Sequence, residues 1–186
     1  MSTLLLAPHS DDEVLFASYL CLKYTPRVLI CTTSKVQEQW GVFAEERTAE
    51  TGAAMEVLGC EDWSQLTFLD TDGAAICDPL RDWLEFDREF SGEPKVAFAP
   101  AFEENGHAQH NAVAAAARAI FGDKVVSYLT YTSNGRSRNG QLNEPDDFDW
   151  IALKLRALAC YRSQLRVENC RPWFNELLDI REWLAW

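Results

Sequence analysis

The chain has 186 residues, of which 47% are apolar and 25% are charged, and its 17 Lys and Arg against 29 Asp and Glu give a formal net charge of −12. This composition excludes a disordered tail and a fibrous repeat, and the length favours one domain that spans residues 1–186. The acidic balance argues against nucleic-acid binding, which requires clustered Lys and Arg to contact phosphates.

Strand and helix patterns alternate along the chain, which is typical of parallel βαβ units. The expected strands are residues 3–7, 28–32, 65–69, 95–99 and 125–132. The expected helices are residues 10–23, 43–58, 79–90, 109–121, 148–165 and 172–186, and residues 133–147 form the longest expected loop. The sequence therefore predicts a single-domain α/β fold with a Rossmann-like, mostly parallel sheet and helices on both faces.

Two of the expected helices carry specific local signals. Ser10-x-x-Glu13 has the form of a capping box, in which each side chain satisfies a backbone N–H that the first turn leaves free. In the third helix, Trp83, Leu84 and Phe86 are predicted to face the core.

The six cysteines are scattered, with no Cys-x-x-Cys pair and no His beside any of them, so we expect neither a zinc–thiolate site nor a disulfide framework. The first residues, MSTLLLAPHSDDE, are not typical of a signal peptide, and no stretch of about 20 apolar residues could span a membrane. The sequence indicates a soluble, cytoplasmic protein with reduced thiols, and it is compatible with a homo-oligomer.

All three histidines fall where an expected strand gives way to a helix. His9 follows the first strand in Pro-His-Ser-Asp-Asp-Glu, and His107 and His110 follow the fourth in Asn-Gly-His-Ala-Gln-His. In an open doubly wound sheet, ligands gather at the carboxyl ends of the strands, near the point where the strand order reverses. If the first and fourth strands are neighbours at that point, the two histidine segments meet.

Such a meeting would supply the ligands of a metal centre. Imidazole nitrogens and carboxylate oxygens bind zinc, and a catalytic zinc keeps three protein ligands and a water. Of the adjacent Asp11 and Asp12, one can bind the metal while the other deprotonates that water, and of His107 and His110, one can bind the metal while the other faces the substrate. The structural alternative is that the acidic run is only the charged first turn of a helix.

The two segments resemble the motifs of the PIG-L/LmbE-like zinc-dependent N-deacetylases, which include N-acetylglucosaminyl-phosphatidylinositol de-N-acetylases. The family's His-Pro-Asp-Asp-Glu motif is similar to residues 9–13, and its Gly-His-x-Asp-His motif is similar to residues 106–110. Residues 46–59, 69–73 and 154–164 resemble further family segments in the same order. The resemblance therefore spans nearly the whole chain.

This resemblance implies a metal, Zn²⁺ or another divalent transition metal, that is bound by His9, Asp12 and His110. It implies that Asp11 is the general base for the zinc-bound water, and that His107 assists the developing oxyanion or protonates the leaving amine. The implied reaction is removal of an acetyl group from a small N-acetylated sugar conjugate of the N-acetylglucosamine type.

Other residues bear on the substrate and on departures from the family pattern. Arg47 corresponds to a basic residue of the family's substrate pocket, although it can equally brace the site through a carboxylate. Arg136 and Arg138 can reach an anionic group of the substrate or remain solvated. Gln109 replaces the usual aspartate that orients a metal-binding histidine, and Tyr161 replaces a histidine.

The choice of substrate stays open at this stage. Trp40 and Phe43 can stack on a sugar face, but a chain with seven tryptophans favours core packing for any one of them. A metal amidohydrolase of the same fold that acts on a non-sugar amide would share every motif residue. A binding protein that has lost turnover is the third reading, and Gln109 is its only support.

Overall fold

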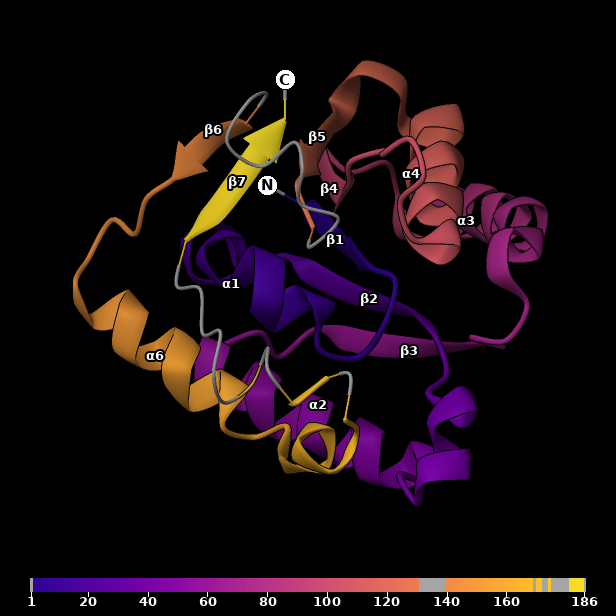
Figure 1. Ribbon diagram of the computed structural model, residues 1–186. Helices are drawn as coiled ribbons and strands as arrows, with labels where there is room; N and C mark the ends of the chain where they lie inside the picture. The colour runs from indigo at the N-terminus through magenta and orange to yellow at the C-terminus, as the bar shows by residue number, and fades with distance from the viewer. Residues whose placement is uncertain (1, 131–139, 169, 172–173, 175–180, 186) are drawn as a thin grey trace.

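The computed structural model describes residues 2–130, 140–168, 170–171, 174 and 181–185, which are arranged around one sheet (Figure 1). The strands are β1 (Thr3–Ala7), β2 (Arg27–Thr32), β3 (Trp63–Phe68), β4 (Val96–Pro100), β5 (Val125–Tyr128), β6 (Gly140–Asn143) and β7 (Glu182–Ala185). The α-helices are α1 (Asp12–Tyr24), α2 (Ala44–Leu58), α3 (Cys77–Ser91), α4 (Ala108–Phe121) and α6 (Asp149–Leu158). Short 3₁₀ helices are η1 (Lys35–Trp40), η2 (Gly73–Ile76), η3 (Gly122–Lys124) and η5 (Arg162–Arg166).

The strands follow the order β3-β2-β1-β4-β5-β7-β6. The first five are parallel, and β7 runs antiparallel to both β5 and β6. The strand order reverses between β1 and β4, which pair directly, with Leu5 opposite Phe98. This adjacency confirms the condition on which the meeting of the histidine segments depended, because ligands bind at such a reversal.

Two apolar layers cover the sheet, one on each face. In β1, Leu5 and Ala7 pack with α1, α2 and α6, whereas Leu4 and Leu6 pack with α3 and α4. The alternation follows from the two-residue period of a strand, and it places α1, α2 and α6 on one face of the sheet and α3 and α4, on the right of Figure 1, on the other. The predicted fold class, with helices on both faces, is confirmed.

Helix α1 is broken at Ala17, where φ is −140° and ψ is 17°. In a regular helix, the Tyr19 N–H would donate to the Leu15 carbonyl. Here the Tyr19 N–H donates to the Glu182 carboxylate at 3.1 Å, and Leu15 accepts from Lys154 Nζ at 2.9 Å. Lys154 and Glu182 form a fully buried ion pair with Nζ and Oε1 2.8 Å apart. This pair fills the break and ties α6 and β7 to the helix that follows His9.

The predicted capping box at the start of α1 is wrong. The helix begins at Asp12, so Asp11 occupies the N-cap position, with φ at 119°. Ser10 is buried and its Oγ accepts from Gln65 Nε2 at 3.2 Å, while the Glu13 carboxylate accepts from the Asp11 N–H at 2.9 Å. The side chain of Ser10, which the sequence pattern predicted to cap the helix, therefore bonds to β3 instead.

The predictions for the C-terminal third also need correction. The helix expected over 172–186 is wrong at its end, where β7 pairs with two strands. Residues 140–143 of the expected loop form β6, and the helix expected over 148–165 ends at Leu158. Strand pairing with distant residues overrides the local helical pattern here.

Two smaller expectations are corrected on the other side of the sheet. Phe86 does not face the core: its side chain is 57% exposed and contacts the ring of Phe90, with the ring centroids 4.4 Å apart. Leu84 is buried as predicted. The strand expected over 125–132 ends at Tyr128. In the part of the chain that the structure describes, no helix has the length and apolar content needed to cross a membrane.

Candidate active site

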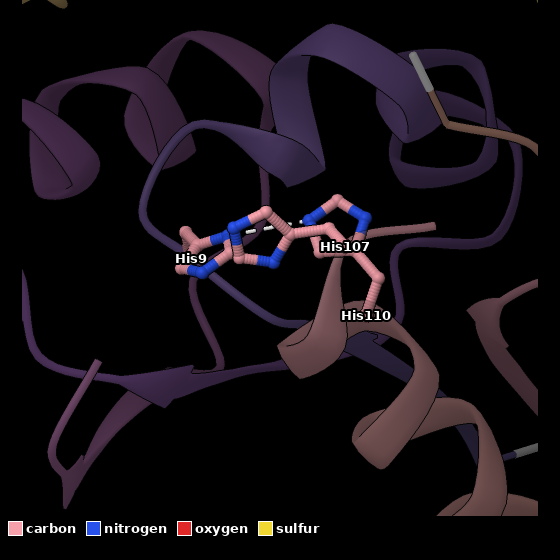
Figure 2. Close-up of side chains that lie close together, drawn as sticks. All are labelled: His9, His107 and His110. Atoms are coloured by element: carbon pink, nitrogen blue, oxygen red, sulfur yellow. Dashed lines mark hydrogen bonds between the residues drawn. The ribbon is translucent and has the colours of Figure 1, made fainter. Parts of the chain in front are cut away.

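The three histidines meet at the carboxyl ends of β1 and β4. His9 lies in the loop after β1, while His107 and His110 lie at the start of α4 (Figure 2). The ring centroids of the three imidazoles are 4.9–5.1 Å apart. Gly106 allows the tight turn before α4, because a Cβ there would lie 2.9 Å from the carbonyl oxygen of Glu103. The meeting predicted from sequence is confirmed.

Three polar atoms converge within this cluster: His9 Nδ1, Asp12 Oδ2 and His110 Nε2. The distances are 3.0 Å from His9 Nδ1 to Asp12 Oδ2, 3.2 Å from His110 Nε2 to the same oxygen, and 3.3 Å between the two nitrogens. Ligands about 2.0–2.1 Å from a tetrahedral ion lie about 3.3 Å from one another. The side chains at these positions therefore fit a zinc ion.

The tautomer of His9 is fixed from behind by Gln109. The Gln109 amide nitrogen donates to the backbone carbonyl of Asp70, which can only accept, so the amide oxygen must face His9. That oxygen lies 2.5 Å from His9 Nε2, which must therefore carry a proton. The lone pair of a neutral His9 is then on Nδ1, directed at Asp12. A glutamine thus orients this histidine as a carboxylate would, without a charge.

His110 is held by a residue that the sequence analysis missed. Its Nδ1 lies 3.1 Å from Thr130 Oγ1, and both residues are buried. This contact leaves Nε2 of His110 directed at Asp12. Thr130 lies just after β5, the strand that pairs with β4. Its position near the carboxyl end of an expected strand could have identified it as a candidate site residue from the sequence.

The electrostatics of the cluster favour a positive charge at its centre. Burial lowers the pKa of His9, but the Asp12 carboxylate and Gln109 outweigh this effect and raise the pKa to about 9. Burial raises the pKa of Asp12, but His110 and His9 outweigh it and hold the pKa well below its usual range. A buried carboxylate with this preference is suited to binding a cation.

His107 could complete a set of three metal ligands in place of Asp12. Its ligand nitrogen lies within 4.8 Å of those of His9 and His110, a looser cluster than the one that Asp12 completes. The Nδ1 atom of His107 is buried and has no hydrogen-bond partner among the described residues. Burial, together with the neighbouring His9 and His110, lowers the pKa of His107 to about 4. This imidazole is therefore neutral near pH 7.

Asp11 lies beside the cluster and is held by Arg47. Its Oδ2 accepts from Arg47 Nη2 at 2.8 Å, and its positive φ is a strained conformation that costs about 1–3 kcal/mol. Arg47 is 1% exposed and also donates to the Ser10 carbonyl and to Glu50. Burial raises the pKa of Asp11 to about 6, although Arg47 opposes the rise. Arg47 also lines the cavity, but its guanidinium contacts Asp11, the Ser10 carbonyl and Glu50, so it holds these groups of the protein in position.

Tyr161 lies beneath Arg47 as part of the same buried support. Its ring centroid is 4.7 Å from the guanidinium carbon, and its hydroxyl bonds to Glu13 and, at 3.2 Å, to Thr51. Burial raises the pKa of Glu13 to about 7, although the bond from Tyr161 opposes the rise. Tyr161, which stands where the family that the sequence resembles often has a histidine, therefore places a buried hydrogen-bond donor behind Asp11.

A cavity of about 620 Å³ opens over the cluster. Its lining includes Ser34, Gln37 and Arg47, and also Asp70, Thr71 and Gly73 from the segment after β3. Two further cavity residues come from the C-terminal part of the chain, Cys170 and Phe174. Arg136 and Arg138 lie outside the described residues, so their contact with a substrate stays a prediction.

The two aromatic residues before Arg47 are not in the core. Trp40 is 49% exposed and Phe43 is 57% exposed, so the expectation that they pack inside is wrong. They lie at the end of η1 and at the N-cap of α2, where the chain turns at the surface.

The sequence of this chain matches a known protein family, and its fold is similar to that of several solved structures. The sequence model of the PIG-L family, described as GlcNAc-PI de-N-acetylase, matches residues 4–121, which include all three histidines. A search of curated proteins gave no match.

Among solved structures, the conserved protein TT1542 from Thermus thermophilus superposes with a TM-score of 0.74 at 22% identity, over 100% of this chain and 94% of that one. N,N'-diacetylchitobiose deacetylase from Pyrococcus horikoshii has a TM-score of 0.67 at 17% identity, over 94% and 73% of the two chains. GalB, the 4-carboxy-2-hydroxymuconate hydratase from Pseudomonas putida, has a TM-score of 0.61 at 15% identity, over 95% and 84%. At these identities, the likenesses establish the fold.

Proposed function

The chain belongs to the PIG-L (GlcNAc-PI de-N-acetylase) family, and from this premise we propose that it is a metal-dependent hydrolase that removes the acetyl group from an N-acetylated sugar conjugate. The observation that carries the proposal is the convergence of His9 Nδ1, Asp12 Oδ2 and His110 Nε2 at 3.0–3.3 Å. These three side chains would hold the metal, with zinc favoured by the mixture of nitrogen and oxygen donors.

When bound, such an ion supplies Lewis acidity that polarises an amide carbonyl and acidifies a water molecule. Asp11 is placed to accept a proton, because its carboxylate borders the cavity and adjoins the ligand Asp12. Arg47 fixes the orientation of that carboxylate through Oδ2. A base whose pKa is raised to about 6 is suited to proton transfer near neutral pH.

His107 is placed to act on the other side of the reacting group. It lines the cavity and, as a neutral imidazole, can donate a hydrogen bond to the oxygen on which negative charge develops. The same ring could pass a proton to the departing amine once it has itself taken up the proton that Asp11 removes from the water. Its role as an additional metal ligand is the alternative that the looser histidine cluster allows.

The size of the cavity supports a sugar substrate. Its volume of about 620 Å³ falls in the range of small-molecule sites, and polar residues of its lining offer hydrogen-bonding groups to hydroxyls. The family description and the chitobiose deacetylase among the structural neighbours both concern N-acetylated glucosamine. We therefore propose N-acetylglucosamine conjugates as the substrate class.

The test is acetate release from N-acetylglucosamine and N,N'-diacetylchitobiose, with N-acetylated amino acids as the non-sugar comparison. We expect acetate from the sugars, loss of activity after the metal is removed by a chelator, and recovery when Zn²⁺ is restored. Release from the amino acids alone would assign the same site to a non-sugar amide. A purified protein that binds no divalent ion and releases no acetate would overturn the proposal and favour a binding protein.

Gln109 provides a separate test of the proposed metal site. Gln109→Ala removes the acceptor for His9 Nε2–H and should weaken zinc binding by about 10–100-fold. Zinc affinity is measured by competition with a chromophoric chelator. Gln65→Ala is the matched control, because Gln65 bonds to Ser10 and Thr32 but touches no proposed ligand. Equal zinc affinities in the two variants would contradict the orienting role of Gln109.

A further inference from the structure

A row of side chains on η1 runs outward from the cavity. A 3₁₀ helix has three residues per turn, so side chains at positions i and i+3 eclipse one another. Ser34, Gln37 and Trp40 therefore share one face of the segment. Ser34 is 5% exposed and Gln37 is half-buried, and both line the cavity, whereas Trp40 is 49% exposed. The row therefore starts at the cavity lining and ends one turn beyond it, at an exposed residue.

The spacing along this row sets how far Trp40 lies from the residues of the row that line the cavity. The rise of a 3₁₀ helix is about 2.0 Å per residue, so Trp40 lies about 6 Å beyond Gln37 and about 12 Å beyond Ser34. Among the described residues of η1, Gln37 lines the cavity and Trp40 does not. Trp40 therefore lies one turn beyond a lining residue without belonging to the lining, next to the space that a second ring attached to a bound sugar would occupy.

The neighbouring helix repeats the pattern. Phe43 occupies the N-cap of α2 and precedes Arg47 by one turn, and the Arg47 N–H donates to the Phe43 carbonyl. Arg47 lines the cavity and is buried, whereas Phe43 is 57% exposed. η1 thus ends, and α2 begins, at an exposed aromatic residue one turn away from a residue that lines the cavity. Aromatic rings with large exposed faces pack well on flat surfaces that are apolar on one side, as the C–H face of a pyranose is.

We propose that Trp40 is a specificity-determining residue that stacks on the sugar ring linked to the N-acetylated sugar, just outside the cavity. This inference rests on the proposed function and refines it, because it makes the substrate a disaccharide or longer glycoside. The contact adds binding for the second ring alone. The acetylated ring, which lies inside the cavity, gains nothing from it.

Kinetics of Trp40→Ala on two substrates test this proposal. We expect the KM for N,N'-diacetylchitobiose to rise about tenfold, the worth of one aromatic contact, while the KM for N-acetylglucosamine stays within about twofold. The KM of Trp40→Phe for N,N'-diacetylchitobiose should stay close to that of the wild type, because phenylalanine retains an aromatic ring. Phe148→Ala is the matched control, because it removes an exposed aromatic ring (83% exposed) from another part of the molecule. Phe148 is the N-cap residue of α6, which begins on the left of Figure 1, whereas β2 and β3 run to the right, toward the carboxyl ends of the parallel strands where the site lies. An equal KM change for both sugars would overturn the proposal.

A binding measurement separates this inference from the question of turnover. The protein is labelled with 5-fluorotryptophan, and the ¹⁹F signal of Trp40 is identified as the one that Trp40→Phe lacks. Titration of the catalytically impaired Asp11→Asn variant with N,N'-diacetylchitobiose should shift that signal, whereas N-acetylglucosamine should leave it in place. Acetate release from sugars without such a shift would refute the role of Trp40 and leave the proposed function standing. A shift without acetate release from either sugar by the wild-type protein would refute the proposed function instead.

Discussion

Replacing Asp11 by Asn should lower the rate of acetate release by about 10²–10⁴-fold while the bound zinc remains stoichiometric. Asparagine fits the same space and can still accept from Arg47 Nη2, but it cannot take a proton near neutral pH. The Asp11 carboxylate is not one of the three converging groups, so its loss removes no proposed ligand. The measurements are initial rates of acetate release and metal content after dialysis.

The adjacent carboxylate provides the contrasting variant. Asp12→Asn should lose the metal as well as the activity, because Oδ2 of Asp12 lies 3.0 Å and 3.2 Å from the two imidazole nitrogens. The pair of variants separates a base from a ligand at neighbouring positions. Near-full activity in Asp11→Asn would eliminate this residue as the base, and zinc retention in Asp12→Asn would favour the three-histidine set, in which His107 replaces Asp12.

Replacing Lys154 by Met should lower the free energy of unfolding by about 3–5 kcal/mol. The Lys154–Glu182 pair is fully buried, so loss of the ammonium leaves the Glu182 carboxylate without its partner in the core. The Leu15 carbonyl in the α1 break also loses its donor. The measurement is urea denaturation followed by circular dichroism, with midpoints and slopes compared with those of the wild type.

Two further variants make this prediction specific to the buried pair. In the double variant Lys154→Met with Glu182→Gln, an uncharged amide oxygen can still accept from the Tyr19 N–H, so most of the lost stability should return. Lys23→Met breaks the Lys23–Asp146 pair, whose side chains are 40% and 53% exposed, and should cost less than about 1 kcal/mol. A similar loss in Lys154→Met and Lys23→Met would show that burial of the pair has little effect on stability.

Local sequence patterns were sufficient for most of the sheet and for the histidine cluster. Short β-branched and apolar runs identified β1, β2 and β4, because strands buried on both faces have few alternatives. His9 and His107 follow these strands, so only the pairing of β1 with β4 was needed to bring the two histidines together. The patterns failed for the capping box and for β7, since Ser10 and Glu182 are fixed by partners 55 and 163 residues away in the chain.

The sequence by itself determined the order of strands and helices as far as β5 and the residue types that gather where β1 and β4 end, because these depend on periodicity and on nearby residues. Only the tertiary structure decided which atoms face one another. It placed Asp12 between two imidazoles and Asp11 against Arg47. It also placed Gln109 between Asp70 and His9 and left Trp40 exposed beyond the cavity. These contacts join elements far apart in the chain, and their geometry follows from packing, which no local pattern encodes.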